Sequence, residues 1–254
     1  MRYILPALLG FALLGFWQWI VGALAVPKFI LPPPSAIFMA FINDFSGLML
    51  ALGTTLAITF FAFFWAVVSG VGLAILFTRA RIIELALAPY VVMLQVTPVV
   101  AIAPLILIWV GFDNINRALI IIAWIIAFFP ILTASIQGLR GVDPQLHDLM
   151  TLSGATWWQR LFYLELPAAL PSILTGAKIS GGLALIGAVM AEFVAGSGAA
   201  TGLAWRIIEA GNRLQIADMF AALMLLSLLG IALFYFLSFC EWLILRHWHE
   251  SFQR

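Results

Sequence analysis

Long apolar stretches separated by short polar segments dominate the chain. A helix needs about 20 mainly apolar residues to cross the hydrocarbon core of a bilayer. Six stretches meet this requirement: Tyr3–Val26, Leu48–Phe77, Leu85–Val110, Ala118–Ile136, Ser172–Ala195 and Asp218–Leu245. The first is too long for a signal peptide and lacks a clean small-residue cleavage site. The pattern therefore predicts an all-α, polytopic protein with six transmembrane helices.

Composition agrees with this prediction. Hydrophobic residues make up 65% of the 254 positions and charged residues only 9%, whereas soluble proteins carry roughly 25% charged residues. So few charges cannot cover a water-facing surface, and we expect the lipid bilayer to surround most of the chain. The net charge of +1 gives no sign of nucleic-acid binding. The single cysteine, Cys240, excludes an internal disulfide.

Three consecutive prolines follow the first apolar stretch and forbid a helix interior. We expect a rigid bend there, followed by a short helix along the membrane surface from Ser35 to about Asp44, with Ser35 as its cap. The predicted organisation is a first helix and proline-rich linker (1–47), a transmembrane domain (48–245) containing a loop at 137–171, and a tail (246–254).

The distribution of lysine and arginine predicts the orientation, because these residues favour the cytoplasmic side. With the N-terminus inside, the cytoplasmic side holds eight of the 12: Arg2, Arg79, Arg81, Arg140, Arg160, Lys178, Arg246 and Arg254. The outer side holds the remaining four: Lys28, Arg117, Arg206 and Arg213. An even number of spans then places both termini in the cytoplasm.

The loop at 137–171 contains signals for two short helices. Asp143 and Pro144 suit the start of the first, as cap and first-turn residue. Gly154 suits its end, because glycine adopts the left-handed conformation most easily. We expect a sharp turn at this glycine between the two helices.

The second helix is predicted to begin at Thr156, with Gln159 completing a capping box. It should end at Leu166, before Pro167. Helical spacing puts four of its residues on one face: Trp158, Leu161, Phe162 and Glu165. Such a face needs a cover, which is either the protein's own membrane helices or a partner protein.

The spacing in this loop resembles that of permeases in binding-protein-dependent ATP-driven (ABC) importers. Their pattern is Glu-Ala-Ala, three residues, Gly, nine residues, then Ile-x-Leu-Pro. Here Asp148-Leu149-Met150 replaces the triplet, Gly154 is the glycine, and Leu164-Glu165-Leu166-Pro167 is the end. The resemblance implies coupling helices that dock in a groove of the ATPase subunit. The residues carried over are Asp148, Gly154, Ala155, Leu164, Leu166 and Pro167.

Further segments resemble one branch of these permeases, which takes up nitrate, sulfonates, taurine and the pyrimidine precursor of thiamine. They are Leu31 to Ser35, Pro98 to Trp109, Gly138 to Pro144 and Leu166 to Pro171. The resemblance implies a type-1 importer fold in the bacterial inner membrane. It also implies a second permease copy, which makes a homodimer, two cytoplasmic ATPase subunits and a periplasmic substrate-binding protein.

Catalytic motifs are missing from the sequence. A phosphate-binding loop needs Gly-Lys, but Lys28 and Lys178 follow proline and alanine. We therefore expect no enzyme activity and no cofactor on this chain, with ATP and Mg²⁺ on the partner ATPase. His147, His247 and His249 do not form a metal-binding pattern, and we expect no metal site.

One face of the fifth apolar stretch is lined by small residues at four-residue spacing: Gly176, Ser180, Ala184 and Ala188. Such faces let helices approach closely. Glu192 is the next position, so this acid should point into a helix contact or a cavity. Acids there commonly mark a pathway or gate. The alternative is a structural acid near the outer end, with partners among the amides of 196–202 or Arg206.

The third stretch carries Pro89, Pro98 and Pro104, with Gln95 and Thr97 nearby. Prolines leave backbone carbonyls unpaired, which a membrane tolerates only where protein or water satisfies them. We therefore expect this stretch, with Gln95, Thr97 and Pro98, to line the translocation pathway. A kinked packing helix is the alternative.

Two other function classes would leave different patterns in the sequence. A secondary transporter would show inverted repeats and midplane acids, and a membrane-embedded enzyme a deep cluster of His, Asp or Ser; neither pattern is evident. The lack of a lysine or arginine deep in a span tilts the expected substrate toward a pyrimidine thiamine precursor. Taurine, an alkanesulfonate or nitrate is the alternative.

Overall fold

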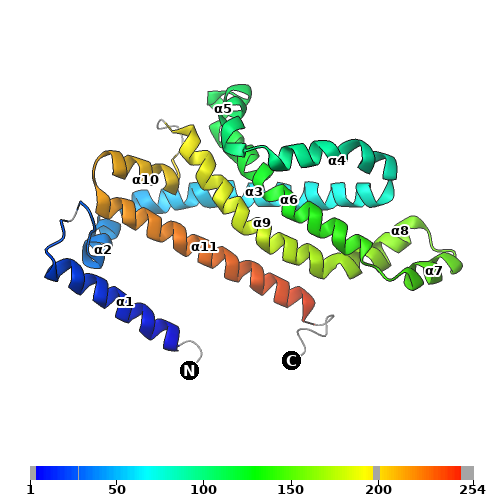
Figure 1. Ribbon diagram of the computed structural model, residues 1–254, viewed down its shortest axis with the longest axis horizontal. Coiled ribbons are helices and arrows are strands. Elements are labelled where there is room, and N and C mark those ends of the chain that lie inside the picture. Colours follow the sequence, from blue (N-terminus) through cyan, green and yellow to red (C-terminus); the bar gives the residue numbers. More distant parts are fainter. Residues whose placement is uncertain (1–3, 28, 197–200, 247–254) are drawn as a thin grey trace. The chain divides into compact units, whose positions relative to one another are not determined.

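The computed structural model describes residues 4–27, 29–196 and 201–246, and within these the chain is helical without strands (Figure 1). The predicted all-α class is confirmed. The elements, in chain order, are α1 (Ile4–Ala23), α2 (Pro34–Asn43), α3 (Phe45–Arg79), α4 (Arg81–Val96), α5 (Val99–Val110), η1 (Phe112–Asn114), α6 (Ile115–Arg140), α7 (Pro144–Leu152), α8 (Trp157–Arg160), η2 (Leu161–Glu165), α9 (Leu166–Ala195), α10 (Leu203–Asn212) and α11 (Ile216–Leu245).

Four of the described helices are long and apolar enough to cross a membrane: Phe45–Arg79, Ile115–Arg140, Trp157–Ala195 and Ile216–Leu245. The bent pair α4–α5 raises this number to five if it counts as one span. The first predicted span corresponds to α1, whose stretch Leu8–Ala23 is a shorter apolar helix. The count of six spans is therefore not confirmed, although the membrane character of the chain is.

The third predicted span is not one continuous helix. α4 and α5 meet at Thr97 and Pro98 with a bend of 104°, and their different directions are visible in Figure 1. Thr97 adopts an extended conformation (φ −71°, ψ 126°), as expected for a residue before proline. Its hydroxyl donates to the carbonyl of Met93 at 2.7 Å, which satisfies one carbonyl at the end of α4. The predicted stretch Leu85–Val110 is thus two helices joined by a break, and the alternative of a single kinked helix does not describe it.

Leu166 and Pro167 do not end a helix, contrary to the sequence prediction. α8 continues through η2, one turn of π-helix, directly into α9. In this widened turn the Leu166 N–H donates to the carbonyl of Leu161, five residues back. Proline in a regular helix would collide with the carbonyl four residues before it. The extra residue in the π turn displaces that carbonyl, so the helix passes through Pro167 unbroken.

The chain forms two compact units. One comprises Met1–Thr55 and Gly196–Leu229, and the other Leu56–Ala195 and Gly230–Arg254. The first unit packs α2 against α10 and the early part of α11, through Ile37, Leu203 and Leu225. α2 begins at Pro34, so the predicted cap at Ser35 is wrong. The Ser35 N–H instead donates to the Gln18 side chain of α1 at 3.2 Å.

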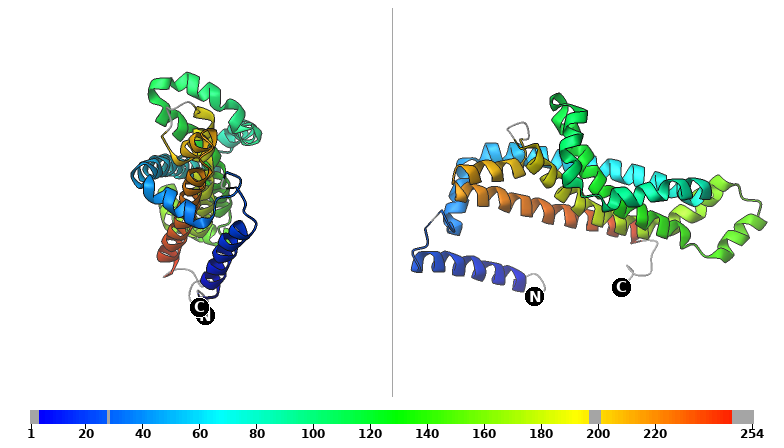
Figure 2. Two further views of the ribbon diagram at one scale, coloured as in Figure 1. Left: turned by 90° about the vertical axis from the view of Figure 1, so that its left-hand side faces the viewer. Right: turned by 45° about the horizontal axis from the view of Figure 1, so that its top comes forward.

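The core of the second unit is the contact between α6 and α9, which lie against each other in Figure 1 and Figure 2. Small residues make this contact close. A Cβ added to Gly187 would lie 2.8 Å from the Ala123 Cα, and one added to Gly176 would lie 2.5 Å from the Ala134 Cβ. The Ser180 hydroxyl donates to the Ala127 carbonyl. The predicted small-residue face of α9 is therefore confirmed as a helix–helix contact.

Candidate functional site

α7 begins and ends as its sequence predicts. The Asp143 carboxylate accepts a hydrogen bond from the Gln145 N–H at 2.9 Å, and Pro144 occupies the first turn. At the other end Gly154 adopts φ +70°. Its N–H donates to the Thr151 carbonyl and the Ala155 N–H to the Met150 carbonyl, both at 3.0 Å. This pair of bonds is a Schellman motif, which satisfies the last carbonyls of the helix.

α8 begins with the predicted capping box. The Gln159 N–H donates to the Thr156 hydroxyl at 3.4 Å, and the Thr156 N–H donates to the Gln159 side chain at 2.7 Å. These reciprocal bonds satisfy two backbone donors that the first turn leaves free. The turn between α7 and α8 is thus fixed by backbone geometry and local side chains.

The predicted face of α8 divides into two. Leu161 is buried in the core, and Glu165 is largely buried. Trp158 and Phe162 instead point outward and stack on each other with ring centroids 5.9 Å apart. The five most exposed large apolar side chains of this loop are what we call the coupling surface: Leu149, Leu152, Trp158, Phe162 and Tyr163.

The coupling surface is unusually apolar for a connecting segment. The side chain of Leu152 is 87% exposed and that of Tyr163 is 76% exposed. α7 has only nine residues and is too short to cross a bilayer, whereas α8 is the first turn of the longer helix Trp157–Ala195. Exposed apolar side chains of this kind are candidates for contact with lipid or with a partner protein.

Six residues of this loop, none of them among the five of the coupling surface, are predicted to take part in coupling. Asp148 and Gly154 are exposed, while the other four are half-buried: Ala155, Leu164, Leu166 and Pro167. His147 Nε2 lies 3.7 Å from Glu165 Oε1 and links α7 to the π turn. The loop is therefore attached to the helix that continues into α9.

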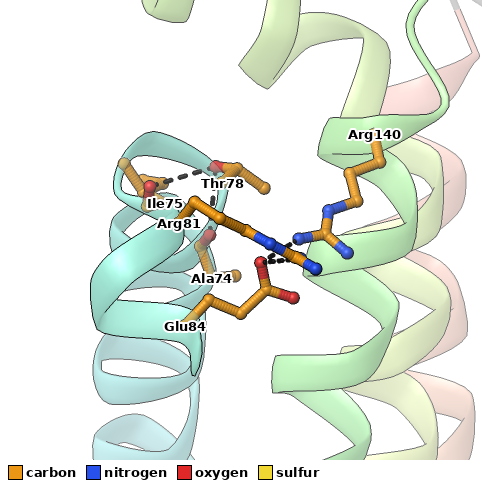
Figure 3. Close-up of polar contacts among 6 residues, drawn as sticks. All are labelled: Ala74, Ile75, Thr78, Arg81, Glu84 and Arg140. Atoms are coloured by element: carbon orange, nitrogen blue, oxygen red, sulfur yellow. Dashed lines mark hydrogen bonds and ion pairs between the residues drawn. The ribbon is translucent and has the colours of Figure 1, made fainter. Parts of the chain in front are cut away.

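A cavity of about 490 Å³ lies behind the coupling loop, within the second unit. Its wall includes the ends of α3 and α6 as well as parts of α7 and α8; the charged or titratable lining residues are Arg79, Arg140, His147, Asp148, Arg160 and Glu165. Beside it, Glu84 accepts from Arg81 at 2.8 Å and from the lining residue Arg140 at 2.6 Å (Figure 3).

Glu192 is fully buried on α9 and does not lack an interaction partner. It continues the buried face formed by Ser180 and Ala188, so its predicted direction, away from lipid, is confirmed. Of its expected partners, residues 197–200 lie outside the described part of the chain. Arg206 forms ion pairs with Asp44 and Glu209 in the first unit.

The other predicted pathway residues lie at the break between α4 and α5. Gln95 and Pro98 are exposed and Thr97 is half-buried. These residues lie where the helix is interrupted. Backbone N–H and C=O groups left unpaired at such a break must be satisfied by protein or water inside a membrane. Of the three histidines, His147 belongs to the coupling loop, whereas His247 and His249 fall outside the described residues. Among those described, no group of three His, Cys, Asp or Glu side chains could hold a metal ion.

Sequence reasoning missed a charged pair between two spans. Lys178 on α9 donates to Glu241 on α11, and both side chains are largely buried. Glu241 is therefore a second acid inside a predicted span, in addition to Glu192. The available signal was the presence of opposite charges in the fifth and sixth apolar stretches.

Comparison with known proteins agrees with this architecture. The sequence profile of the family described as "binding-protein-dependent transport system inner membrane component" matches residues 66–241. Three relatives were compared over most of their length. The riboflavin transport system permease protein of Chloroflexus aurantiacus is 35% identical over 94% of this chain and 88% of its own.

The formylaminopyrimidine transport permease protein of Halalkalibacterium halodurans is 32% identical over 89% of this chain and 88% of its own. The taurine transport system permease protein of Escherichia coli is 28% identical over 87% and 81%. A solved structure of the MetNI methionine ABC transporter in an inward-facing conformation superposes with a TM-score of 0.65 at 22% identity, covering 81% of this chain and 97% of that one.

The profile match covers more than half of the chain and the apolar helices carry the membrane character that such a component needs. The chain belongs to the family of inner membrane permease components of binding-protein-dependent ABC importers.

Proposed function

We propose that this permease works with separate cytoplasmic ATPase subunits that dock on the coupling surface. The observation that carries the proposal is the exposed stack of Trp158 and Phe162, beside the nearly uncovered Leu152, on a loop with rigid caps. A capped turn gives this apolar surface a fixed shape that a partner can fit without ordering cost. The ATPase subunits would bind ATP and Mg²⁺, which leaves this chain without a cofactor.

The importer would contain two copies of this permease and receive its substrate from a periplasmic binding protein. ATP binding would close the ATPase pair and move the coupling loops. Because α8 continues through η2 into α9, that movement would be passed directly to the helix that carries Glu192. Hydrolysis would reset the assembly. Glu192, Gln95, Thr97 and Pro98 remain the proposed pathway residues, and both termini the proposed cytoplasmic ends.

The docking proposal is tested by purifying the tagged permease from its native membrane and measuring the ATPase subunit that accompanies it. Leu152→Gln and Phe162→Gln remove exposed apolar side chains without disturbing the core, so the permease should fold and lose the partner. Burying one such side chain contributes about 1.5–3 kcal/mol, which corresponds to a tenfold or greater loss of affinity. Gln145→Ala, an exposed polar position on α7, is the matched control. Full retention of the ATPase by both variants would place the docking site elsewhere.

The proposed substrate is a small organic nutrient, with a pyrimidine thiamine precursor favoured. Lys178 is matched by Glu241 and therefore offers no free charge for an anion, which supports an uncharged ring. Two of the relatives are named as transporters of riboflavin and formylaminopyrimidine, which are both heteroaromatic compounds. A taurine-type sulfonate, as in the third relative, or nitrate is the alternative. Thermal-shift screening of the cognate binding protein against these compounds separates the candidates.

A further inference from the structure

The cavity behind the coupling loop is lined by three arginines, and two of them have no carboxylate partner among the described residues. Arg79, Arg140 and Arg160 line it together with only two carboxylates, those of Asp148 and Glu165. Glu165 lies beside His147. Arg140 also pairs with Glu84, which lies outside the lining, so the arginines that remain unmatched are Arg79 and Arg160.

Two of the three arginines have no carboxylate within ion-pair distance among the described residues. Arg79 places its guanidinium 4.7 Å from the centroid of the Trp157 ring, a cation–π contact that fixes its position but leaves its charge unmatched. Arg160 donates from Nη1 to the Thr151 hydroxyl at 3.3 Å. Its Nε is buried and has no hydrogen-bond partner.

A buried donor without a partner costs free energy, and a charged one costs more. Two guanidinium groups on one cavity also repel each other. An anion between them removes both penalties, because a guanidinium offers several N–H donors in a planar fork that matches oxyanions. The volume of about 490 Å³ is ample for such a group and its hydration.

We propose that this cavity binds a phosphate-type oxyanion, held chiefly by Arg79 and Arg160, with Arg140 as a third contact. Arg79 is the last residue of α3 and Arg140 the last of α6, so the site lies where two candidate spans end. Lipid headgroups lie at that level of a membrane. The phosphate can therefore come from an anionic lipid or from a free anion in solution. Either occupant would connect the end of α3 to α8.

Binding can be measured on the full-length permease alone in lipid nanodiscs, so that failure of the ATPase proposal leaves this test intact. In discs of phosphatidylcholine only, inorganic phosphate is added and its binding followed by equilibrium dialysis. In a second series the discs contain phosphatidylglycerol, and native mass spectrometry counts the anionic lipids that remain on the protein. Phosphate binding in the first series identifies a free-anion site, and retention of phosphatidylglycerol alone identifies a headgroup site. Either result supports the proposal.

The variants assign the binding to the cavity. Arg79→Gln and Arg160→Gln should each lower the affinity for the anion at least tenfold. Arg160→Lys keeps the charge but not the planar fork, so its affinity should lie between those of the glutamine variants and the wild type. Arg81→Gln is the matched control, because Arg81 lies near Arg79 but pairs with Glu84 and does not line the cavity. A thermal melt verifies that each variant is folded. The proposal is overturned if neither probe binds, or if Arg81→Gln weakens binding as much as Arg160→Gln.

Discussion

Gly154 separates the two helices of the coupling loop, and its φ of +70° is the feature on which their angle depends. Nothing lies within 4 Å of the position where a Cβ would be, so a side chain there meets no steric neighbour. A substitution at Gly154 therefore tests backbone conformation alone.

We expect Gly154→Leu to insert in the membrane and to lose uptake. A branched residue in the left-handed region costs roughly 1–2 kcal/mol, which favours a different angle between α7 and α8. Gly154→Asn is the control, since asparagine tolerates this conformation, and it should retain most uptake. The measurement is substrate uptake by cells with equal amounts of permease. Wild-type uptake by the leucine variant would show that the turn does not matter for coupling.

Glu192 is the buried acid that should organise the pathway. Glu192→Gln keeps the shape and removes the charge, so uptake should fall while insertion and ATPase co-purification persist. Glu192→Ala should fall further, because it also loses hydrogen-bonding capacity. A lost hydrogen bond to a charged group costs roughly 1.5–3 kcal/mol, enough to shift a two-state gate about tenfold. Uptake into vesicles with excess binding protein is the readout. Wild-type rates in both variants would make Glu192 a purely structural residue.

Residue-level prediction worked at the three caps of the coupling loop, although the cap predicted at Ser35 was wrong. The caps at Asp143, Gly154 and Thr156 are encoded within four residues of chain, and all three were found. The pairs Lys178–Glu241 and Asp44–Arg206 join residues far apart in sequence. One sequence carries no signal that chooses among the opposite charges available to each, so these pairs required the fold.

Among the elements, α9 and α11 are joined by the Lys178–Glu241 pair, whose side chains are 27% and 12% exposed. Lys178→Met leaves a carboxylate without its partner between two spans and should lower the unfolding midpoint in nanodiscs. The loss of folding free energy should be smaller than the roughly 3–5 kcal/mol lost when one partner of a fully buried ion pair is removed. Glu241→Gln on its own should also destabilise.

The double variant Lys178→Met with Glu241→Gln removes both charges and should recover much of the midpoint, because no uncompensated charge remains. Additive losses in the double variant would mean that the two side chains do not depend on each other. An unchanged unfolding midpoint in Lys178→Met would likewise show that Glu241 does not depend on Lys178.

Proline positions show the limit of element-level prediction. A residue before proline disfavours helical geometry, yet Thr97-Pro98 and Leu166-Pro167 behave in opposite ways. At Pro98 the chain becomes extended and the helix breaks by 104°. At Pro167 a π turn takes up the extra residue and the helix continues. Which response occurs depends on packing around each proline, including Leu161 in the core, and this packing is not visible in a hydropathy pattern.

At the scale of the whole molecule, fold class and family followed from hydropathy and from the spacing of the coupling loop. Hydropathy and spacing can both be read directly from the amino-acid sequence. The number of spans did not follow, because α1 and the bent pair α4–α5 fall at the boundary of what length and composition define. The substrate did not follow either, since relatives with similar sequences are named for chemically different cargoes.

The most direct test of the account is uptake into proteoliposomes that contain the permease with and without its ATPase subunits. The binding protein and labelled substrate are supplied outside and ATP inside. We predict that the permease alone neither hydrolyses ATP nor accumulates substrate, and that adding the ATPase subunits gives uptake that requires ATP. A Leu152→Gln, Phe162→Gln double variant should lose this uptake. Accumulation by the permease alone, driven by an imposed ion gradient, would contradict the account and indicate a secondary transporter.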